Sequence, residues 1–480
     1  MMSVPRLAPQ RRFALAATAL AAASFLVACS GDSPGGTVVE PPPPPPTPVL
    51  TTLAVTLSTA TISVGGTATA AAAGRDQFGK AIAAGTITWS SSADSVATVT
   101  NTGSITGISV GQTTITAVSS SVTASAVLNV TPGGMAACRL PAQYGGATLG
   151  FPRVAARHRT VGDVHVPVVF IDFPDAVATR TPEQVYGILS PMAAAFYSAV
   201  SYGRMNLVLE PTFVWNRMSK ASSQYGWSAP SFNVQKAYIE EALSLATTTD
   251  FSQADAFAII SNPDAGAIMQ GRAFVANAGT GATVQGRTID NGVISGRDLT
   301  DWGGLWLSHE MGHTMGLPDL YASSGAALRY VGNFGLMGLI TGFAPEFFAW
   351  ERWQLGWIDD DQVSCATSSG TIEVLLSPIE RVGGMKMVVI PTGPSSAVVV
   401  ESRRAEGYDT SDVWTPGVLI YSVDTSLSTG NGPLKVLPIN DLDSWKSSAP
   451  LLVGGTMSVG GVTITFVSTT AEGDVVRVVR

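Results

Sequence analysis

Residues 306–321 read WLSHEMGHTMGLPDLY, and this stretch decides how the middle of the chain folds. Side chains four residues apart lie on one face of a helix, so His309 and His313 would present both imidazoles to a single metal ion. Glu310 follows the first imidazole, where its carboxylate would reach a water molecule on the metal without binding the metal itself. The chain contains four histidines, and the other two lie far upstream, at His158 and His165. The stretch therefore predicts a helix that carries a metal site.

The same stretch supplies a candidate third ligand. Gly316 permits the left-handed turn that ends a helix, and Pro318 prevents the helix from continuing. The chain would then turn back and bring the carboxylate of Asp319 toward the metal. Two glutamates on a later predicted helix are the alternative ligands, Glu346 and Glu351.

The spacing His309-Glu-x-x-His313 is the arrangement found in zinc peptidases. With Gly316 and Asp319 added, it resembles the extended metzincin motif, with Asp in place of the usual third His. Downstream, the Leu-Met-Gly segment around Met337 resembles the methionine turn beneath the metal in such enzymes, and a place in the hydrophobic core is its alternative role. The resemblance implies one catalytic Zn²⁺ held by the two histidines and the aspartate.

Together these features resemble the immune inhibitor A-like family of secreted bacterial metallopeptidases, which have a zincin-type fold. The resemblance covers roughly residues 160–425. The segments that carry it are 169–175, 201–204, 309–321, 336–338, 353–357, 401–404 and 417–421. Two positions depart from the family pattern: Gly335 stands where relatives often carry an acidic residue, and Pro345-Glu346 stands where they often carry His. These departures concern the surroundings of the site and leave the metal helix unaffected.

The resemblance implies a surface-tethered endopeptidase that hydrolyses peptide bonds of extracellular or periplasmic proteins. In that reaction zinc activates a water molecule and Glu310 acts as the general base. Tyr321 and Tyr330 are candidate donors to the oxyanion. Trp302 and Trp306 are candidates for a dry wall of the cleft. Two other functions remain open: an inert peptidase fold used for adhesion or binding, and a zinc amidase that acts on cell-wall material.

The amino terminus is typical of an export signal. A basic segment with Arg11 and Arg12 precedes an uncharged apolar run over 13–28. The residues before Cys29 resemble a bacterial lipobox, which implies removal of residues 1–28 and lipidation of that cysteine. We therefore expect a lipid anchor in the outer membrane or at the cell surface, with release from it left open. An ordinary signal peptide with an incidental cysteine is the alternative, and the sequence does not choose between the general and the twin-arginine route.

The next segments predict a spacer and a small β-domain. Residues 29–48 contain six consecutive prolines, which favour a semi-rigid polyproline linker. Residues 49–131 alternate short β-branched runs with turn residues, a pattern typical of a β-sandwich. Its segments Val-Gly-Gly-Thr, Ser-Val-Ala-Thr-Val and Gly-Ser-Ile-Thr-Gly resemble a bacterial Ig-like domain of group 2. Trp89 is expected to anchor its core, and such domains serve as spacers or adhesion modules.

The rest of the chain divides by its pattern into two parts. Residues 139–360 mix apolar runs of strand length with helical spacing, which favours an α+β or α/β domain. The resemblance to the metallopeptidase family implies that this domain is an α+β domain of the zincin type. These runs are 166–173, 182–199, 232–246 and 256–260. Residues 361–480 return to β-branched runs. The predicted fold class is therefore multi-domain: an Ig-like β-sandwich, an α+β zincin-type metallopeptidase domain and a C-terminal β-rich domain.

Cysteine and charge content restrict the chemistry further. With Cys29 assigned to lipidation, Cys138 and Cys365 form an even pair that favours a disulfide in an oxidising compartment. Free thiols, or Cys138 as a blocking ligand of the metal, are the alternatives. Lys and Arg total 27 against 35 Asp and Glu, and no basic stripe is present, which excludes nucleic acid as a partner.

The expected partners are protein or peptide substrates and, through Cys29, a membrane; we expect a monomer. Two acidic clusters, 359–361 and 441–443, offer oxygen ligands for a structural Ca²⁺. Solvated surface charge accounts for both clusters as well, so the sequence does not support calcium binding.

Overall fold

The computed structural model of the 480-residue chain describes residues 46–64, 66–108, 111–131, 134–143, 145–410, 413–438 and 443–480. The predicted signal peptide, the predicted lipidation site Cys29 and the predicted linker through residue 45 lie outside the described residues, as do residues 441 and 442 of the second acidic cluster. Among the described helices, none has the length and apolar character that a membrane crossing requires.

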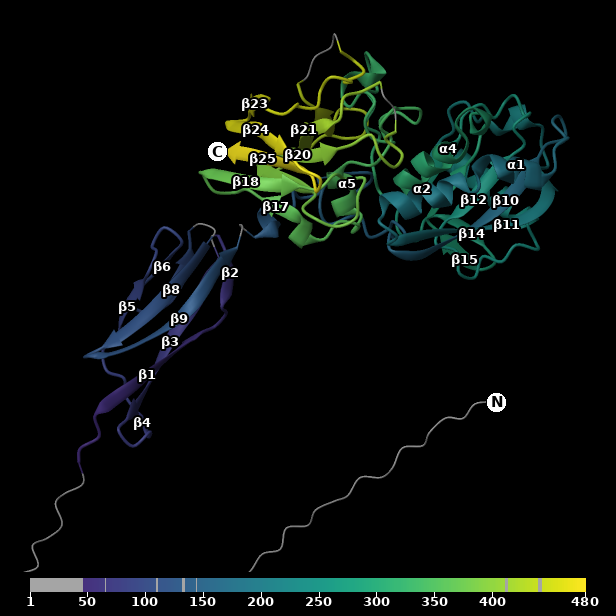
Figure 1. Cartoon of the computed structure of the whole chain (residues 1–480). Coiled ribbons are helices and arrows are strands. Elements are labelled where there is room, and N and C mark those ends of the chain that lie inside the picture. Colours follow the sequence, from purple (N-terminus) through teal and green to yellow (C-terminus); the bar gives the residue numbers. More distant parts are fainter. Residues whose placement is uncertain are drawn as a thin grey trace, which may run out of the picture. The chain divides into compact units, whose positions relative to one another are not determined.

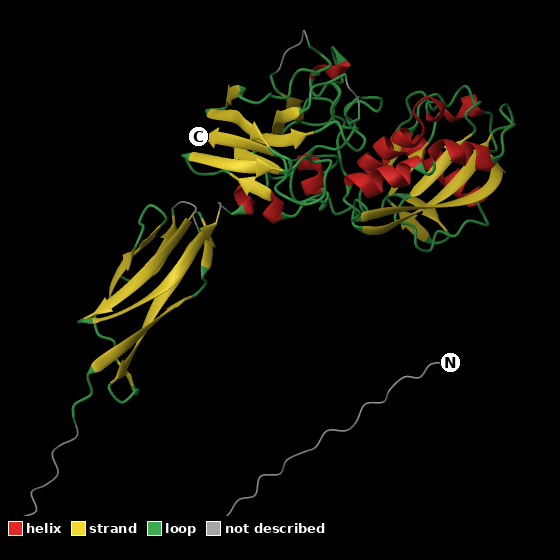
Figure 2. Cartoon of the chain, in the orientation of Figure 1, coloured by secondary structure: helices red, strands yellow, loops and turns green. Residues whose placement is uncertain are grey.

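The first folded part is a small sandwich of two β-sheets (Figures 1 and 2). One sheet has the order β1(Leu50–Leu57), β3(Thr67–Asp76), β7(Ser104–Gly107), β6(Ala97–Val99), with β4(Ala81–Ile82) also paired to β3. The other has the order β2(Thr61–Ser63), β9(Val122–Thr131), β8(Gly111–Ser119), β5(Thr88–Ser91). Side chains alternate between the two faces of a strand, so Ile115 and Ala117 of β8 are fully buried between the sheets. Trp89 is half-buried and packs against this core, as predicted.

The middle of the chain is built on a five-stranded sheet of order β11-β10-β12-β16-β13. Four strands run parallel: β10(Gly162–Asp172), β11(Met205–Arg217), β12(Phe257–Ser261) and β16(Asn291–Ile294). The fifth, β13(Arg272–Val275), is antiparallel and lies at the edge. Val166 and Val168 of β10 belong to one hydrophobic core, whereas Val169 and Ile171 belong to another. Burial on both faces explains why the sequence of β10 is a nearly continuous apolar run.

Helices cover both faces of this sheet. One core includes side chains of α1(Pro182–Leu189), α2(Met192–Val200) and α4(Leu299–Thr314), and the opposite core includes those of α3(Phe232–Leu245). The predicted helical run over 182–199 is two helices, because Pro191 lacks a backbone N–H and disfavours a helical conformation at Ser190. This part also contains a small hairpin, formed by β14(Ala282–Val284) and β15(Arg287–Ile289). Its three short 3₁₀ helices are η1(Met135–Ala137), η2(Ser222–Tyr225) and η3(Ala327–Arg329).

After α5(Ala349–Gln354) and η4(Asp360–Gln362), the chain forms two more sheets. The first has the order β17(Val363–Cys365), β19(Met387–Pro391), β20(Ser396–Arg403), β21(Gly417–Asp424), β22(Leu434–Val436). The second has the order β18(Thr371–Leu376), β25(Asp474–Val479), β24(Val462–Thr469), β23(Thr456–Val459). Val398 and Val400 of β20 face the second sheet, whereas Val399 belongs to the core that also contains α4 and α5. Cys138 and Cys365 form a disulfide, which confirms the predicted pairing.

Candidate metal centre

Helix α4 carries the candidate metal ligands and is buried along most of its length. It begins after Asp298, is interrupted at Gly303 (φ +54°) and continues to Thr314. His309 and Glu310 are only 5% and 9% exposed. Polar groups buried to this extent are costly unless they have partners, so their surroundings indicate what they do.

The end of α4 turns the chain back beneath the helix. Gly316 has φ +102°, in the region that favours glycine, and its N–H donates to the His313 carbonyl at 2.9 Å. The Leu317 N–H donates to the Gly312 carbonyl at 3.1 Å, so the last carbonyls of the helix have partners. The sequence predicts this turn from Gly316 and Pro318. The reversal brings Asp319 back to the two histidines.

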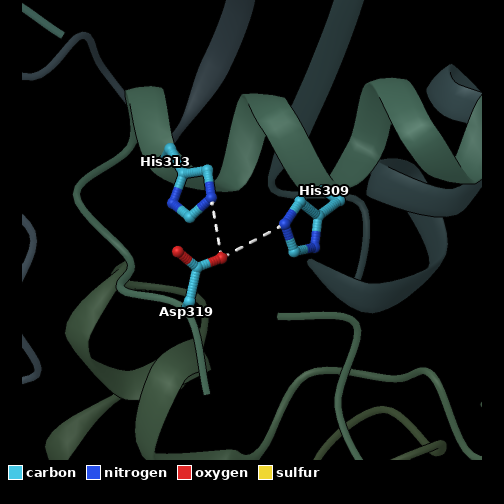
Figure 3. Close-up of side chains that lie close together, drawn as sticks. All are labelled: His309, His313 and Asp319. Carbon is cyan, nitrogen blue, oxygen red and sulfur yellow. Dashed lines mark ion pairs between the residues drawn. The ribbon is translucent and has the colours of Figure 1, made fainter. Parts of the chain in front are cut away.

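His309, His313 and Asp319 converge on one point (Figure 3). Asp319 Oδ1 lies 3.4 Å from His309 Nε2 and 3.2 Å from His313 Nε2. This oxygen is buried and accepts no hydrogen bond from the described residues that meets normal geometry. Two imidazole nitrogens and one carboxylate oxygen are a ligand set that suits zinc, and three protein ligands leave a fourth position open. The residues present therefore fit a catalytic zinc ion.

Backbone carbonyls fix the orientation of both imidazoles. His309 Nδ1 lies 2.9 Å from the Leu336 carbonyl, and His313 Nδ1 lies 2.8 Å from the Leu317 carbonyl. Since a carbonyl oxygen only accepts, each Nδ1 must carry the proton and donate. When the imidazoles are neutral, each Nε2 is then the unprotonated nitrogen, and both Nε2 atoms lie on the side of Asp319, where they could bind one metal ion.

The electrostatic environment favours the ionised form of the carboxylate. Burial is the largest single effect on the pKa of His313 and lowers it. The charge of Asp319 and the hydrogen bond to it, together with Glu310 and the Leu317 carbonyl, outweigh burial and raise this pKa to about 9. Burial also raises the pKa of Asp319, and the two histidines lower it by more, so the net pKa lies well below its usual range. Ionised carboxylate is the form that binds a metal ion.

Met337 lies directly against the metal helix. It is fully buried, and a Cβ added at Gly312 would lie only 2.5 Å from its sulfur atom. The preceding residue, Leu336, supplies the carbonyl that orients His309, and the Met337 carbonyl accepts from the Leu320 N–H at 2.9 Å. The segment around Met337 thus supports the histidine and the turn that carries Asp319.

A pocket of about 300 Å³ opens beside the ligands. Glu310 and His309 line it, together with Trp302 and Tyr321. Among the described groups, none forms a hydrogen bond or ion pair with the Glu310 carboxylate, which leaves it free to act on a molecule in the pocket. Two other candidates lie elsewhere: Trp306 is fully buried, and Tyr330 does not line this pocket.

The alternative ligands are committed to other partners. Glu346 pairs with Arg352 at 2.5 Å, and Glu351 accepts from the Phe348 N–H at 2.9 Å. His158 contacts Thr314 Oγ1 through Nε2 at 2.8 Å, and His165 pairs with Glu210. Of the described residues, only His309, His313 and Asp319 form a cluster that could hold a metal.

One residue near the site has no signal in the local sequence. Thr429, 110 positions after Asp319, forms two hydrogen bonds with it. The contact brings a loop of the C-terminal sheets to the metal ligands. Only the tertiary structure connects these segments, so no motif spacing would have found it.

Comparison with known proteins concerns the first folded part. A family model, the bacterial Ig-like domain (group 2), matches residues 50–130. Among solved structures, domains 5-6 of the S-layer protein SbsC match with 28% identity and a TM-score of 0.16, over 18% of this chain and 46% of that chain. Domains 4 and 5 of the same protein match with 27% identity and a TM-score of 0.16, over 18% of this chain and 53% of that chain.

The match thus spans about half the length of each of these two S-layer chains. No curated protein matches this sequence. The family match confirms the Ig-like domain expected from the sequence, and it identifies residues 50–130 as a bacterial Ig-like domain of group 2.

Proposed function

We propose that this protein is a zinc-dependent endopeptidase of the zincin type. The convergence of His309, His313 and Asp319 beside a pocket that also holds Glu310 is the observation that supports this proposal. Two oriented imidazoles and one carboxylate bind the metal, and the neighbouring carboxylate is left for proton transfer. A cluster that served stability alone would have no need of an unpaired glutamate at the mouth of a pocket.

The chemistry follows from the placement of these side chains. A bound zinc ion would supply Lewis acidity, which activates water and polarises the carbonyl to be attacked. Glu310 takes a proton from the attacking water and delivers it to the departing amine. Burial, followed by the charge of Asp319, raises the pKa of Tyr321, so its phenol keeps its proton and is a donor for the developing oxyanion.

We further propose that the enzyme acts at the cell surface. The Ig-like domain supports this location, because such domains are modules of bacterial surface proteins. The export signal and the lipidation of Cys29, both read from the sequence, would tether the enzyme there. Substrates would then be proteins or peptides outside the cytoplasm.

The exchange E310Q tests the catalytic proposal. The variant should bind zinc like the wild type, because Glu310 is not a ligand, yet lose at least about 100-fold of its activity on casein, because it lacks the base. The exchange H313A should instead lose zinc, measured by metal analysis of the purified protein. Full activity of E310Q would reject Glu310 as the base, and casein hydrolysis that a chelator does not stop would reject the role of zinc. A wild-type protein that hydrolyses no casein would contradict the proposal as a whole and leave adhesion as the function that the Ig-like domain supports.

A further inference from the structure

The loop between β21 and β22, residues 425–433, reaches the third candidate ligand. Thr429 Oγ1 accepts a hydrogen bond from the Asp319 N–H at 2.9 Å. The same hydroxyl donates to Asp319 Oδ2 at 3.1 Å. A single hydroxyl therefore binds both the backbone and the carboxylate of Asp319, which fixes the side chain relative to its own main chain.

The two carboxylate oxygens are thereby given different roles. Oδ2 receives the threonine proton, and Oδ1 is left facing the two imidazoles at 3.2 and 3.4 Å. A carboxylate that was free to rotate would present either oxygen, and it would lose conformational entropy when it bound a metal. Hydrogen bonds of this kind to a ligand typically change metal affinity by about 10- to 100-fold.

Further contacts hold the loop in place. The Gly430 N–H donates to the Asp319 carbonyl at 3.2 Å, and the Gly430 carbonyl accepts from the Ser323 N–H at 2.9 Å. Within the loop, Asn431 Nδ2 donates to Ser428 Oγ at 2.8 Å. Backbone contacts on both sides of the threonine keep its hydroxyl at the carboxylate.

We propose that Thr429 is a positioning residue for the metal ligand Asp319, and that the loop between β21 and β22 is part of the metal centre. The proposal rests on the proposed function, since it assumes that Asp319 binds zinc. It extends that function by making zinc affinity depend on a residue of the C-terminal sheets.

The test is zinc affinity of the full chain, measured by competition with a chromophoric chelator. T429V keeps the branched shape and removes the hydroxyl, and it should weaken zinc binding by about 10- to 100-fold. T429S restores the hydroxyl and should bind zinc within about threefold of the wild type. The visible spectrum of the Co²⁺-loaded protein should change in T429V, because it reports the ligand geometry.

Ser428→Ala is the matched control, since it removes a neighbouring hydroxyl that bonds Asn431 and not Asp319. It should leave zinc affinity unchanged, and all variants should unfold at the wild-type temperature without metal. Wild-type zinc affinity and an unchanged Co²⁺ spectrum in T429V would overturn the positioning role while leaving the metal site in place. A wild-type chain that binds no zinc would instead overturn the proposed function, and this inference with it.

Discussion

His158 is a buried histidine that stabilises the fold only while it is uncharged. Its Nδ1 lies 2.6 Å from the Arg159 carbonyl, and its Nε2 lies 2.8 Å from Thr314 Oγ1, at the end of the metal helix. Burial lowers its pKa from the ordinary value of 6.5 to about 4, and Arg153 contributes in the same direction. The native state therefore resists protonation in a range where the unfolded chain accepts a proton.

We predict that this residue makes the protein less stable in mild acid. As the pH falls below about 6.5, the unfolded state gains a proton and the native state does not, until the pH reaches about 4. The difference amounts to about 2 kcal/mol at pH 5 relative to pH 7.5. Urea unfolding at the two pH values measures it. In H158Q the loss of unfolding free energy between pH 7.5 and pH 5 should be smaller by about 2 kcal/mol. If the variant lost as much stability as the wild type over this range, groups other than His158 would cause the effect.

Single residues also show where the sequence was informative about the site. The spacing of His309 and His313 on a helix, and the turn expected from Gly316 and Pro318, were enough to bring Asp319 to the histidines. Two of the groups that orient these ligands come from distant parts of the chain. The carbonyl that fixes His309 comes from residue 336, and the hydroxyl that binds Asp319 comes from residue 429, so both depend on how distant segments pack.

At the scale of elements, strand β20 and the segment around α5 share a buried group of charges. Arg403 is fully buried and pairs with Glu401 at 2.7 Å and with Asp409 at 2.6 Å. Its guanidinium also donates to the Glu346 carbonyl at 3.1 Å. Together with the pair that its side chain forms with Arg352, this network places Glu346, a candidate ligand in the sequence, apart from the cluster of His309, His313 and Asp319. Nothing in its local sequence distinguishes a ligand from a member of a buried ion network.

Removal of Arg403 should therefore destabilise the protein strongly. R403M leaves two buried carboxylates without their partner, which typically costs about 3–5 kcal/mol. The matched control is R477M, because Arg477 pairs with Glu373 on the surface, where both side chains are nearly half exposed. That variant should change stability by less than about 1 kcal/mol. Urea unfolding measures the free energy of unfolding of both variants. If R403M and R477M lost the same stability, burial of the Arg403 ion pairs would not be the cause of the loss.

The sequence predicted those helices and strands whose pattern is local, and it missed a strand that depends on distant pairing. The apolar run of β10 and the helical spacing of α3 were visible in the sequence, because burial on a defined face imposes them. The antiparallel edge strand β13 was not predicted, since Arg272–Val275 is short and its pairing with β16 comes from the tertiary fold.

At the scale of the whole molecule, the hydrophobic cores define what folds together. The Ig-like domain has a core of its own, which includes Ile62, Ile105 and Leu128 and, among the described residues, none beyond 130. In contrast, one core joins residues on both sides of position 360, including Trp350 and Tyr421. The disulfide between Cys138 and Cys365 also connects the two sides. The predicted boundary at 360 thus falls between segments that share their packing.

This division predicts opposite results for two truncations. The fragment 132–480 should fold and bind zinc as the full chain does, because the core it loses is separate. The fragment 132–360 should not fold, because it loses part of the shared core and also the loop that holds Asp319. Circular dichroism and zinc titration measure both outcomes.

The fragment 132–360 also lacks Cys365 and therefore the disulfide, so the effect of the missing cross-link on stability must be measured separately. In 132–480, replacement of both Cys138 and Cys365 by serine removes the cross-link between positions 227 residues apart, which costs roughly 5 kcal/mol by the chain-entropy relation. That variant keeps the whole core, so it should retain native near-ultraviolet dichroism at 10 °C while unfolding at lower urea concentration than its parent. If the fragment 132–360 folded and bound zinc with wild-type affinity, the metal centre would be independent of the C-terminal sheets, and the shared core would have no part in forming it.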